Sequence, residues 1–144
     1  MIFLTAPTDF KSAFDVSACF VECDGKILLL HRAAHKVEGN KWGMPAGKIE
    51  KGEEVTVAMA RELLEETGLT ASPSDFTPIK TVFVRYPERD MVFHMFLLRL
   101  EILPEVRLNS LEHQAFRWTT PAESLAMPLM MDEDICVKIA YENA

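Results

Sequence analysis

Three glutamates in the middle of the chain have a spacing that would bring their carboxylates together. Glu62, Glu65 and Glu66 stand at positions i, i+3 and i+4, so in a helix they lie on one face within about one turn. Like charges at this spacing repel, at a cost of roughly 0.2–0.5 kcal/mol per pair. Mg²⁺ is bound by carboxylate oxygens together with the phosphates of a substrate. The cluster therefore indicates a metal site for phosphate chemistry.

An acidic helix face is also an ordinary solvated surface, which is the more frequent explanation of such a cluster. The spacing of the surrounding residues decides between the two. Nine positions follow a fixed pattern, and average residue usage would produce it in about one window in a billion or fewer. The pattern consists of Gly47, then Glu53, then Arg61, Glu62 and Leu63, then Glu65 and Glu66, then Gly68 and Leu69.

This pattern is the Nudix box, and the chain resembles the Nudix hydrolases. The resemblance implies an α/β (α+β) fold, a mixed curled β-sheet sandwiched between α-helices, with the box as a loop, a helix and a loop at its edge. It also implies hydrolysis of a nucleoside diphosphate linked to another group, with Mg²⁺ as the cofactor and Mn²⁺ as an alternative. Metal ions neutralise phosphate oxygens and activate water, as such a reaction requires.

The resemblance also assigns the metal ligands. Glu62 and Glu66 are the first choice, Glu65 is the next, and the backbone carbonyl of Ala46, just before the box, is expected to join them. These groups offer only oxygen atoms, which is the ligand type that hard divalent cations prefer.

Other box residues are expected to support these ligands. Arg61 should pair with Glu53 across the start of the helix and hold the ligands in place rather than bind phosphate. Gly47, Glu53 and Gly68 are assigned structural support. The predicted catalytic residues are Arg61, Glu62, Glu65 and Glu112.

The general base is the least defined of these roles. In the family it comes either from the box or from a glutamate in a later loop. Glu112, just before the last expected strand, stands where such a loop glutamate would be, and His113 is the alternative. A glutamate in a loop is more often simply solvated.

Three residues are expected to contact the substrate: Arg32, Lys48 and Tyr86. Arg32 ends an apolar strand and Lys48 follows Gly47, so both would offer a positive charge to phosphate. Aromatic and methionine side chains suit the nucleobase, but each is more often part of a core. Tyr86, Phe83, Phe93 and Met130 are the candidates, and Trp42 is equally compatible with packing or with a substrate wall.

Composition limits the remaining possibilities. The 144 residues are 49% apolar and 26% charged, which predicts one globular domain spanning residues 1–144. Apolar runs are too short to cross a bilayer and the N-terminus does not resemble a signal peptide, so we expect a cytoplasmic protein. The net charge of −7 disfavours nucleic acid as a partner. Three cysteines without a paired motif favour neither disulfides nor zinc.

The pattern of the chain predicts most of its elements. Alternating apolar residues over 14–22, an Asp-Gly turn and the apolar run 26–32 predict a hairpin. Residues 33–47 are expected to be a loop. A helix is expected from Glu53 or Glu54 to Thr67, with an apolar stripe of Val57, Ala60, Leu63 and Leu64. Later elements are a hairpin over 76–86 and 91–100, a strand over 115–119, a helix start at 120–121, and a helix over 132–142 with Ile135, Val137 and Ile139 partly inward.

The box does not choose the substrate. The short chain is most similar to family members that cleave a nucleoside triphosphate to monophosphate and pyrophosphate, and this is the leading prediction. Dinucleoside polyphosphates and nucleotide sugars are alternatives, as is a Nudix domain that senses nucleotides without turnover. The sequence leaves open whether the protein forms a homodimer.

Overall fold

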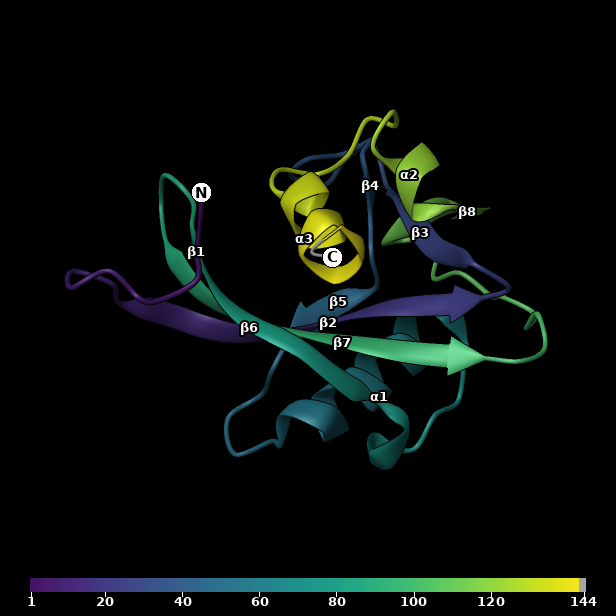
Figure 1. Cartoon of the computed structure of the whole chain (residues 1–144), viewed down its shortest axis with the longest axis horizontal. Coiled ribbons are helices and arrows are strands. Elements are labelled where there is room, and N and C mark those ends of the chain that lie inside the picture. Colours follow the sequence, from purple (N-terminus) through teal and green to yellow (C-terminus); the bar gives the residue numbers. More distant parts are fainter. Residues whose placement is uncertain (143–144) are drawn as a thin grey trace.

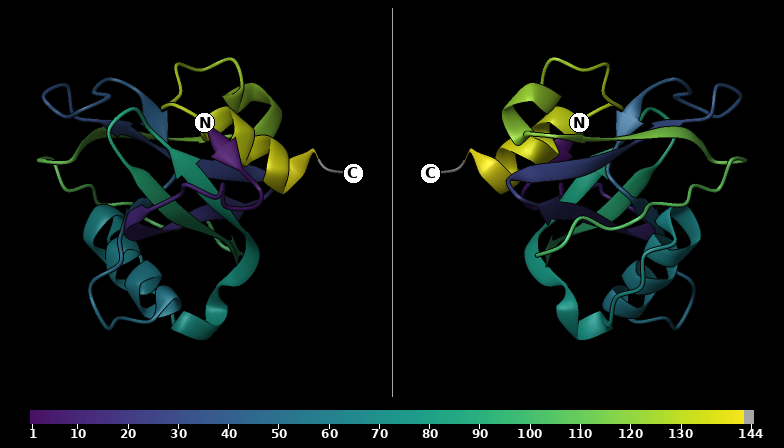
Figure 2. Two further views of the ribbon diagram at one scale, coloured as in Figure 1. Left: turned by 90° about the vertical axis from the view of Figure 1, so that its left-hand side faces the viewer. Right: turned by 90° about the vertical axis from the view of Figure 1, so that its right-hand side faces the viewer.

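A single mixed β-sheet forms the centre of the molecule, and helices cover both of its faces (Figure 1). The computed structural model describes residues 1–142. The eight strands follow the order β1-β6-β7-β2-β3-β4, with β5 paired to β2 and β8 paired to β3. Helix α1 lies on one side of the sheet and α3 on the other, as the two side views confirm (Figure 2). This is the mixed sheet between helices that the resemblance implies.

The first predicted hairpin is confirmed. Strand β2 (Ser12–Cys23) turns through Asp24 and Gly25 into β3 (Lys26–Arg32), and the two strands pair antiparallel at the turn. Both turn residues have positive φ values, 52° and 75°, as a two-residue hairpin turn requires. Residues 27–30 of β3 are fully buried, as expected of a strand that is covered on both faces.

The second predicted hairpin is also confirmed, and it makes the sheet mixed. Strands β6 (Thr77–Arg85) and β7 (Asp90–Leu100) pair antiparallel, whereas β7 and β2 pair in parallel along almost their whole length. Strand β1 (Ile2–Phe3), which the sequence did not predict, adds to the outer edge of β6.

The predicted loop over residues 33–47 is only partly a loop. It contains β4 (Trp42–Gly43) and leads into β5 (Ala46–Lys48). Strand β5 pairs with β2 through Ala46 opposite Ala18 and Gly47 opposite Ser17. This pairing fixes the start of the box against a central strand.

Helix α1 (Val55–Thr67) carries the box glutamates. It ends as predicted at Gly68, whose φ of 74° is the left-handed conformation that glycine adopts readily. The predicted apolar stripe was half wrong. Val57 and Leu64 are 41% and 53% exposed, and the buried face consists of Ala58, Met59, Leu63 and Thr67.

The C-terminal part is close to prediction. Strand β8 (His113–Thr119) is followed by α2 (Pro121–Ser124), whose preceding Thr120 side chain accepts a hydrogen bond from the Glu123 backbone N–H. Helix α3 covers Glu133–Tyr141. Val137 is buried and Ile139 is half-buried as expected, but Ile135 is exposed. The remaining short element is a 3₁₀ turn, η1 (Pro73–Asp75).

Two apolar clusters lie on opposite faces of the sheet, because alternate residues of β2 point to opposite faces. Val16, Ala18 and Phe20 belong to the cluster that includes Val137 of α3. Cys19 and Val21 belong to the other, together with Met59 and Leu63 of α1. Between residues 1 and 142 no helix has the length and apolar character needed to span a bilayer.

Candidate active site

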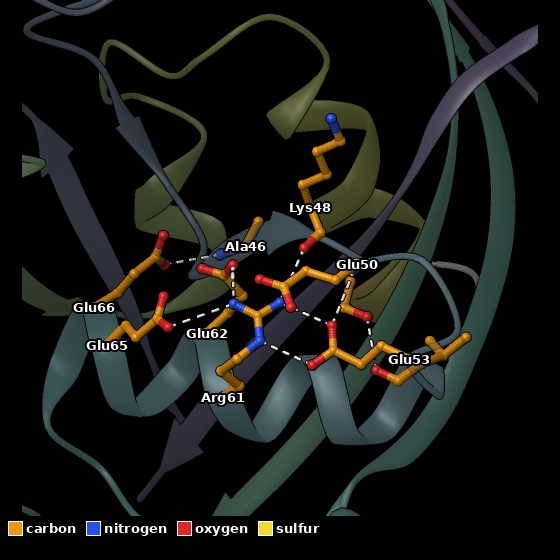
Figure 3. A network of polar contacts seen from close by, with 10 residues as sticks. Ala46, Lys48, Glu50, Glu53, Arg61, Glu62, Glu65 and Glu66 are labelled. Carbon is orange, nitrogen blue, oxygen red and sulfur yellow. Dashed lines mark hydrogen bonds and ion pairs between the residues drawn. The ribbon is translucent and has the colours of Figure 1, made fainter.

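The acidic side of α1 lies directly against β5. Gly47 has room only for hydrogen at its Cα, because a Cβ there would overlap the carboxyl group of Glu62. Glu66 Oε1 accepts a hydrogen bond of 3.0 Å from the backbone N–H of Ala46. Figure 3 shows both carboxylates pointing from the helix toward this short strand. The glycine therefore permits the close approach of helix and strand on which the site is built.

Arg61 lies at the centre of the network of polar contacts (Figure 3). Its guanidinium donates two hydrogen bonds to the carboxylate of Glu53, from Nε at 2.8 Å and from Nη2 at 2.9 Å. Its Nη1 reaches Glu62 at 2.8 Å and Glu65 at 3.4 Å, and Nη2 reaches the Lys48 carbonyl at 3.1 Å. The predicted Arg61–Glu53 pair is confirmed. The same group orients Glu62 and links the helix to β5.

The carboxylates differ in their electrostatic surroundings. Hydrogen bonds from Arg61 lower the pKa of Glu53 to about 2. Burial raises the pKa of Glu62 and raises that of Glu66 well above its ordinary value, and the neighbouring charge of Glu62 adds to the latter effect. Glu65 is 55% exposed. Glu62 and Glu66, whose pKa values are raised by burial, are the box carboxylates for which a nearby cation would be most favourable.

A cavity of about 230 Å³, here called the phosphate-side cavity, opens between α1, β5 and the loop before β8. Among residues 1–142, no three acidic, histidine or cysteine side chains already form a closed metal cage. Mg²⁺ does not need one, because it keeps several waters and uses one or two carboxylates together with substrate phosphates. The carboxylate oxygens of this lining therefore fit a hydrated divalent ion. The lining residues are Arg32, Ala46, Gly47, Lys48, Glu62, Glu65, Glu66, Asn109 and Glu112.

Glu112 lies on this cavity, opposite the helix. Lys36 holds its carboxylate at 2.9 Å and lowers its pKa, so the group is ionised near neutral pH. The alternative base, His113, is buried, and burial lowers its pKa to about 4. Glu112 is ionised and lies on the cavity, which favours it over His113 as the group that could accept a proton from water.

Two cations flank the cavity. Arg32 lies where the phosphate-side cavity meets a larger cleft, and its Nε donates to the Val37 carbonyl at 2.9 Å. The Lys48 side chain points away from the carboxylates, and its Nζ lies 4.8 Å from the centroid of the Phe14 ring (Figure 3). Both residues line both spaces, as a contact with phosphate would require.

The larger cleft, of about 630 Å³, runs from β5 to the loop before α3. Tyr86, Phe93 and Met130 form part of its wall. Phe83 lies elsewhere, edge-on against Phe10 with ring centroids 5.4 Å apart. Trp42 stacks on His31 at 4.5 Å, which supports the packing interpretation of this residue.

Comparison with known proteins agrees with this geometry. The model of the NUDIX domain matches residues 11–135. The chain belongs to the Nudix family. A CTP pyrophosphohydrolase of Escherichia coli K12 is 33% identical over 117 residues, which cover 80% of this chain and 82% of that protein. The phosphatase NudJ of the same strain is 30% identical over 132 residues, covering 83% and 79%.

The fold is shared with solved structures of the family. A MutT NUDIX hydrolase from Burkholderia pseudomallei superimposes with a TM-score of 0.76 at 26% identity, covering 87% of this chain and 95% of that one. The chain is thus a Nudix hydrolase, an enzyme that acts on nucleoside diphosphates linked to another group. Enzymes of this family generally depend on a divalent metal.

Some residues of the site were missed from the sequence. Phe14 and Met91 line the cleft, Met131 lies beside Met130, and Asn109 lies on the phosphate-side cavity. Glu133, the first residue of α3, is the least expected, because it is buried next to the cleft. An acidic residue at a helix start is an ordinary feature, so only the fold reveals its position.

Proposed function

We propose that this Nudix hydrolase cleaves a nucleoside triphosphate to a nucleoside monophosphate and pyrophosphate with Mg²⁺, or Mn²⁺, as cofactor. One observation carries the proposal. The cleft has an apolar wall that contains Tyr86, Phe93 and Met130, and through Arg32 and residues 46–48 it adjoins the phosphate-side cavity on the acidic side of α1. A nucleotide has the same two parts, a charged phosphate chain and a flat base, and the cleft volume is in the range of small-molecule sites.

In this proposal Glu62 and Glu66 hold the metal, with Glu65 and the Ala46 carbonyl as additional ligands. When bound, the ion would neutralise phosphate oxygens and lower the pKa of a bound water. Arg61 keeps Glu62 in position through its contacts with Glu53 and Lys48. Arg32 and Lys48 neutralise the phosphate chain, and Glu112 accepts a proton from the attacking water.

The triphosphate is favoured over other substrates by the relative named CTP pyrophosphohydrolase, the more similar of the two described above. The name of NudJ, a phosphatase, points instead to release of orthophosphate. The two outcomes differ in the bond that is broken, and product analysis distinguishes them.

The test is hydrolysis of CTP, UTP, ATP and GTP with Mg²⁺ in ¹⁸O-labelled water, with dinucleoside polyphosphates, ADP-ribose and nucleotide sugars assayed in parallel. We expect monophosphate and pyrophosphate from the triphosphates, with one ¹⁸O atom in one of the two products. Orthophosphate and a nucleoside diphosphate would contradict the proposal. So would turnover confined to one of the other substrate classes.

A further inference from the structure

A buried carboxyl group lies at the inner end of the cleft, far in sequence from the box. A cavity of about 80 Å³, here called the inner cavity, lies between α3 and the sheet. It shares Ala46, Tyr86, Phe93 and Met130 with the large cleft, so the two spaces adjoin. Glu133 also lines it and is only 7% exposed.

One oxygen of this carboxyl has a partner and the other does not. Glu133 Oε1 accepts a hydrogen bond of 3.2 Å from the backbone N–H of Met44. Oε2 is buried and has no hydrogen-bond partner among the residues described. A buried acceptor without a partner is costly. Because Glu133 lines the inner cavity, a ligand group that enters this cavity can supply the missing donor.

The surroundings define what that group must be. The walls shared with the cleft are an aromatic pair, Tyr86 and Phe93, and the flexible thioether of Met130, which suit the faces of a flat ring. An ionised carboxylate only accepts hydrogen bonds. A flat ring that carries an amino group on its edge therefore fits both features.

We propose that Glu133 is a specificity-determining residue whose Oε2 accepts a hydrogen bond from the exocyclic amino group of the substrate base. The cleft then selects cytosine, and other amino-bearing bases, over uracil and thymine. This inference rests on the proposed function, because it assumes that a nucleotide occupies the cleft with its phosphates on the acidic side of α1.

CTP and UTP form a matched pair for this test, since position 4 of the pyrimidine carries an amino donor in CTP and a carbonyl acceptor in UTP. Burial raises the pKa of Glu133 to about 7, so the assay is run at about pH 8.5, where the carboxyl is ionised. We expect kcat/KM for CTP to exceed that for UTP by about tenfold to hundredfold, because UTP places a carbonyl oxygen against the carboxylate where CTP places its amino group.

The variant Glu133→Gln should place a hydrogen-bond donor in the cavity where the wild type has an acceptor. The Met44 N–H needs an acceptor and holds the amide oxygen, so the amide NH₂ takes the place of Oε2 and offers a donor. The CTP to UTP ratio should fall to about one or below. Asp134→Asn is the matched control, since it removes a charge from the same helix start but not from the cavity lining, and its ratio should stay as in the wild type.

The wild-type protein alone also decides the question if the variant fails to fold. The triphosphate of 2-pyrimidinone riboside lacks only the amino group of CTP, and we expect it to lose most of the preference. Equal kcat/KM for this compound, CTP and UTP would overturn the inference while leaving the proposed reaction intact. If no triphosphate is cleaved, the proposed reaction is wrong, and equal binding of CMP and UMP would then reject the role of Glu133 separately.

Discussion

Glutamates line both of the cavities that adjoin the cleft, but in opposite surroundings. On the phosphate side, Glu53, Glu62 and Glu65 are joined by Arg61, and Glu66 is bonded to a backbone N–H. At the inner end, Glu133 has one bonded oxygen and one without a partner among the residues described. The pKa of Glu53 is lowered to about 2 by Arg61, whereas burial raises that of Glu133 to about 7.

This contrast separates two tasks. A cluster of carboxylates near cations suits a metal and phosphates, which all nucleotide substrates share. A single carboxyl among apolar side chains suits recognition of one edge of a base, which differs between substrates. Changes on the phosphate side should therefore lower activity on every substrate alike, and changes at the inner end should alter the ratio between substrates.

The largest expected effect comes from removing a metal ligand. Glu66→Gln or Glu62→Gln should lower kcat/KM by about 10³-fold or more for CTP and UTP equally, because charge stabilisation by a metal contributes several kcal/mol. Pyrophosphate release with Mg²⁺ measures the loss, and circular dichroism shows that the fold survives. Glu54→Gln, at the exposed helix start, is the control. Full activity of either ligand variant would reject the ligand assignment.

A smaller loss is expected for the candidate base. Glu112→Gln should lower kcat by about 10²-fold with little change in KM, since the group is assigned to proton transfer and not to binding. Steady-state kinetics over a range of pH should also show that the acidic limb of the profile is lost. Normal turnover with an unchanged profile would remove Glu112 from the mechanism. A glutamate of the box would then be the candidate for the general base.

The smallest effect concerns stability. The pKa of Glu53 is about 2 in the folded protein, below its ordinary value of 4.5, because Arg61 donates two hydrogen bonds to it. A lowered pKa contributes stability above the unfolded value and loses it as the pH falls through the folded one. The melting temperature of the wild type should thus exceed that of Glu53→Gln above about pH 4.5, with the difference shrinking toward about pH 2. A difference that does not vary with pH would contradict this account.

Much of the phosphate side could be predicted from the sequence because its determinants are local. The box spacing located Glu62 and Glu66, Gly68 marked the end of α1, and Asp24 with Gly25 marked the first turn. It was harder to predict from the sequence which residues of α1 face the sheet. The face against the sheet includes Thr67, whose hydroxyl donates to the Leu63 carbonyl at 2.6 Å and so can be buried. A prediction that counted only apolar residue types did not include Thr67.

The inner end could not be predicted because its determinants are distant in sequence. Glu133 meets Met44 across 89 residues and faces side chains from β6–β7 and the loop before α3. Strands β4 and β5 are also too short to show a period in the sequence, and they form because β3 and β2 supply their partners. Such features depend on tertiary pairing, which local patterns do not encode.

The central claim is that the acidic side of α1 binds a divalent ion next to β5. Titration of Mn²⁺ into ¹⁵N-labelled protein tests it directly, because the paramagnetic ion broadens the amide signals closest to it. We predict selective broadening at residues 46–48 and 62–66, abolished by Glu66→Gln. Broadening centred elsewhere, for example on residues 101–105, or unchanged in the variant, would contradict the account.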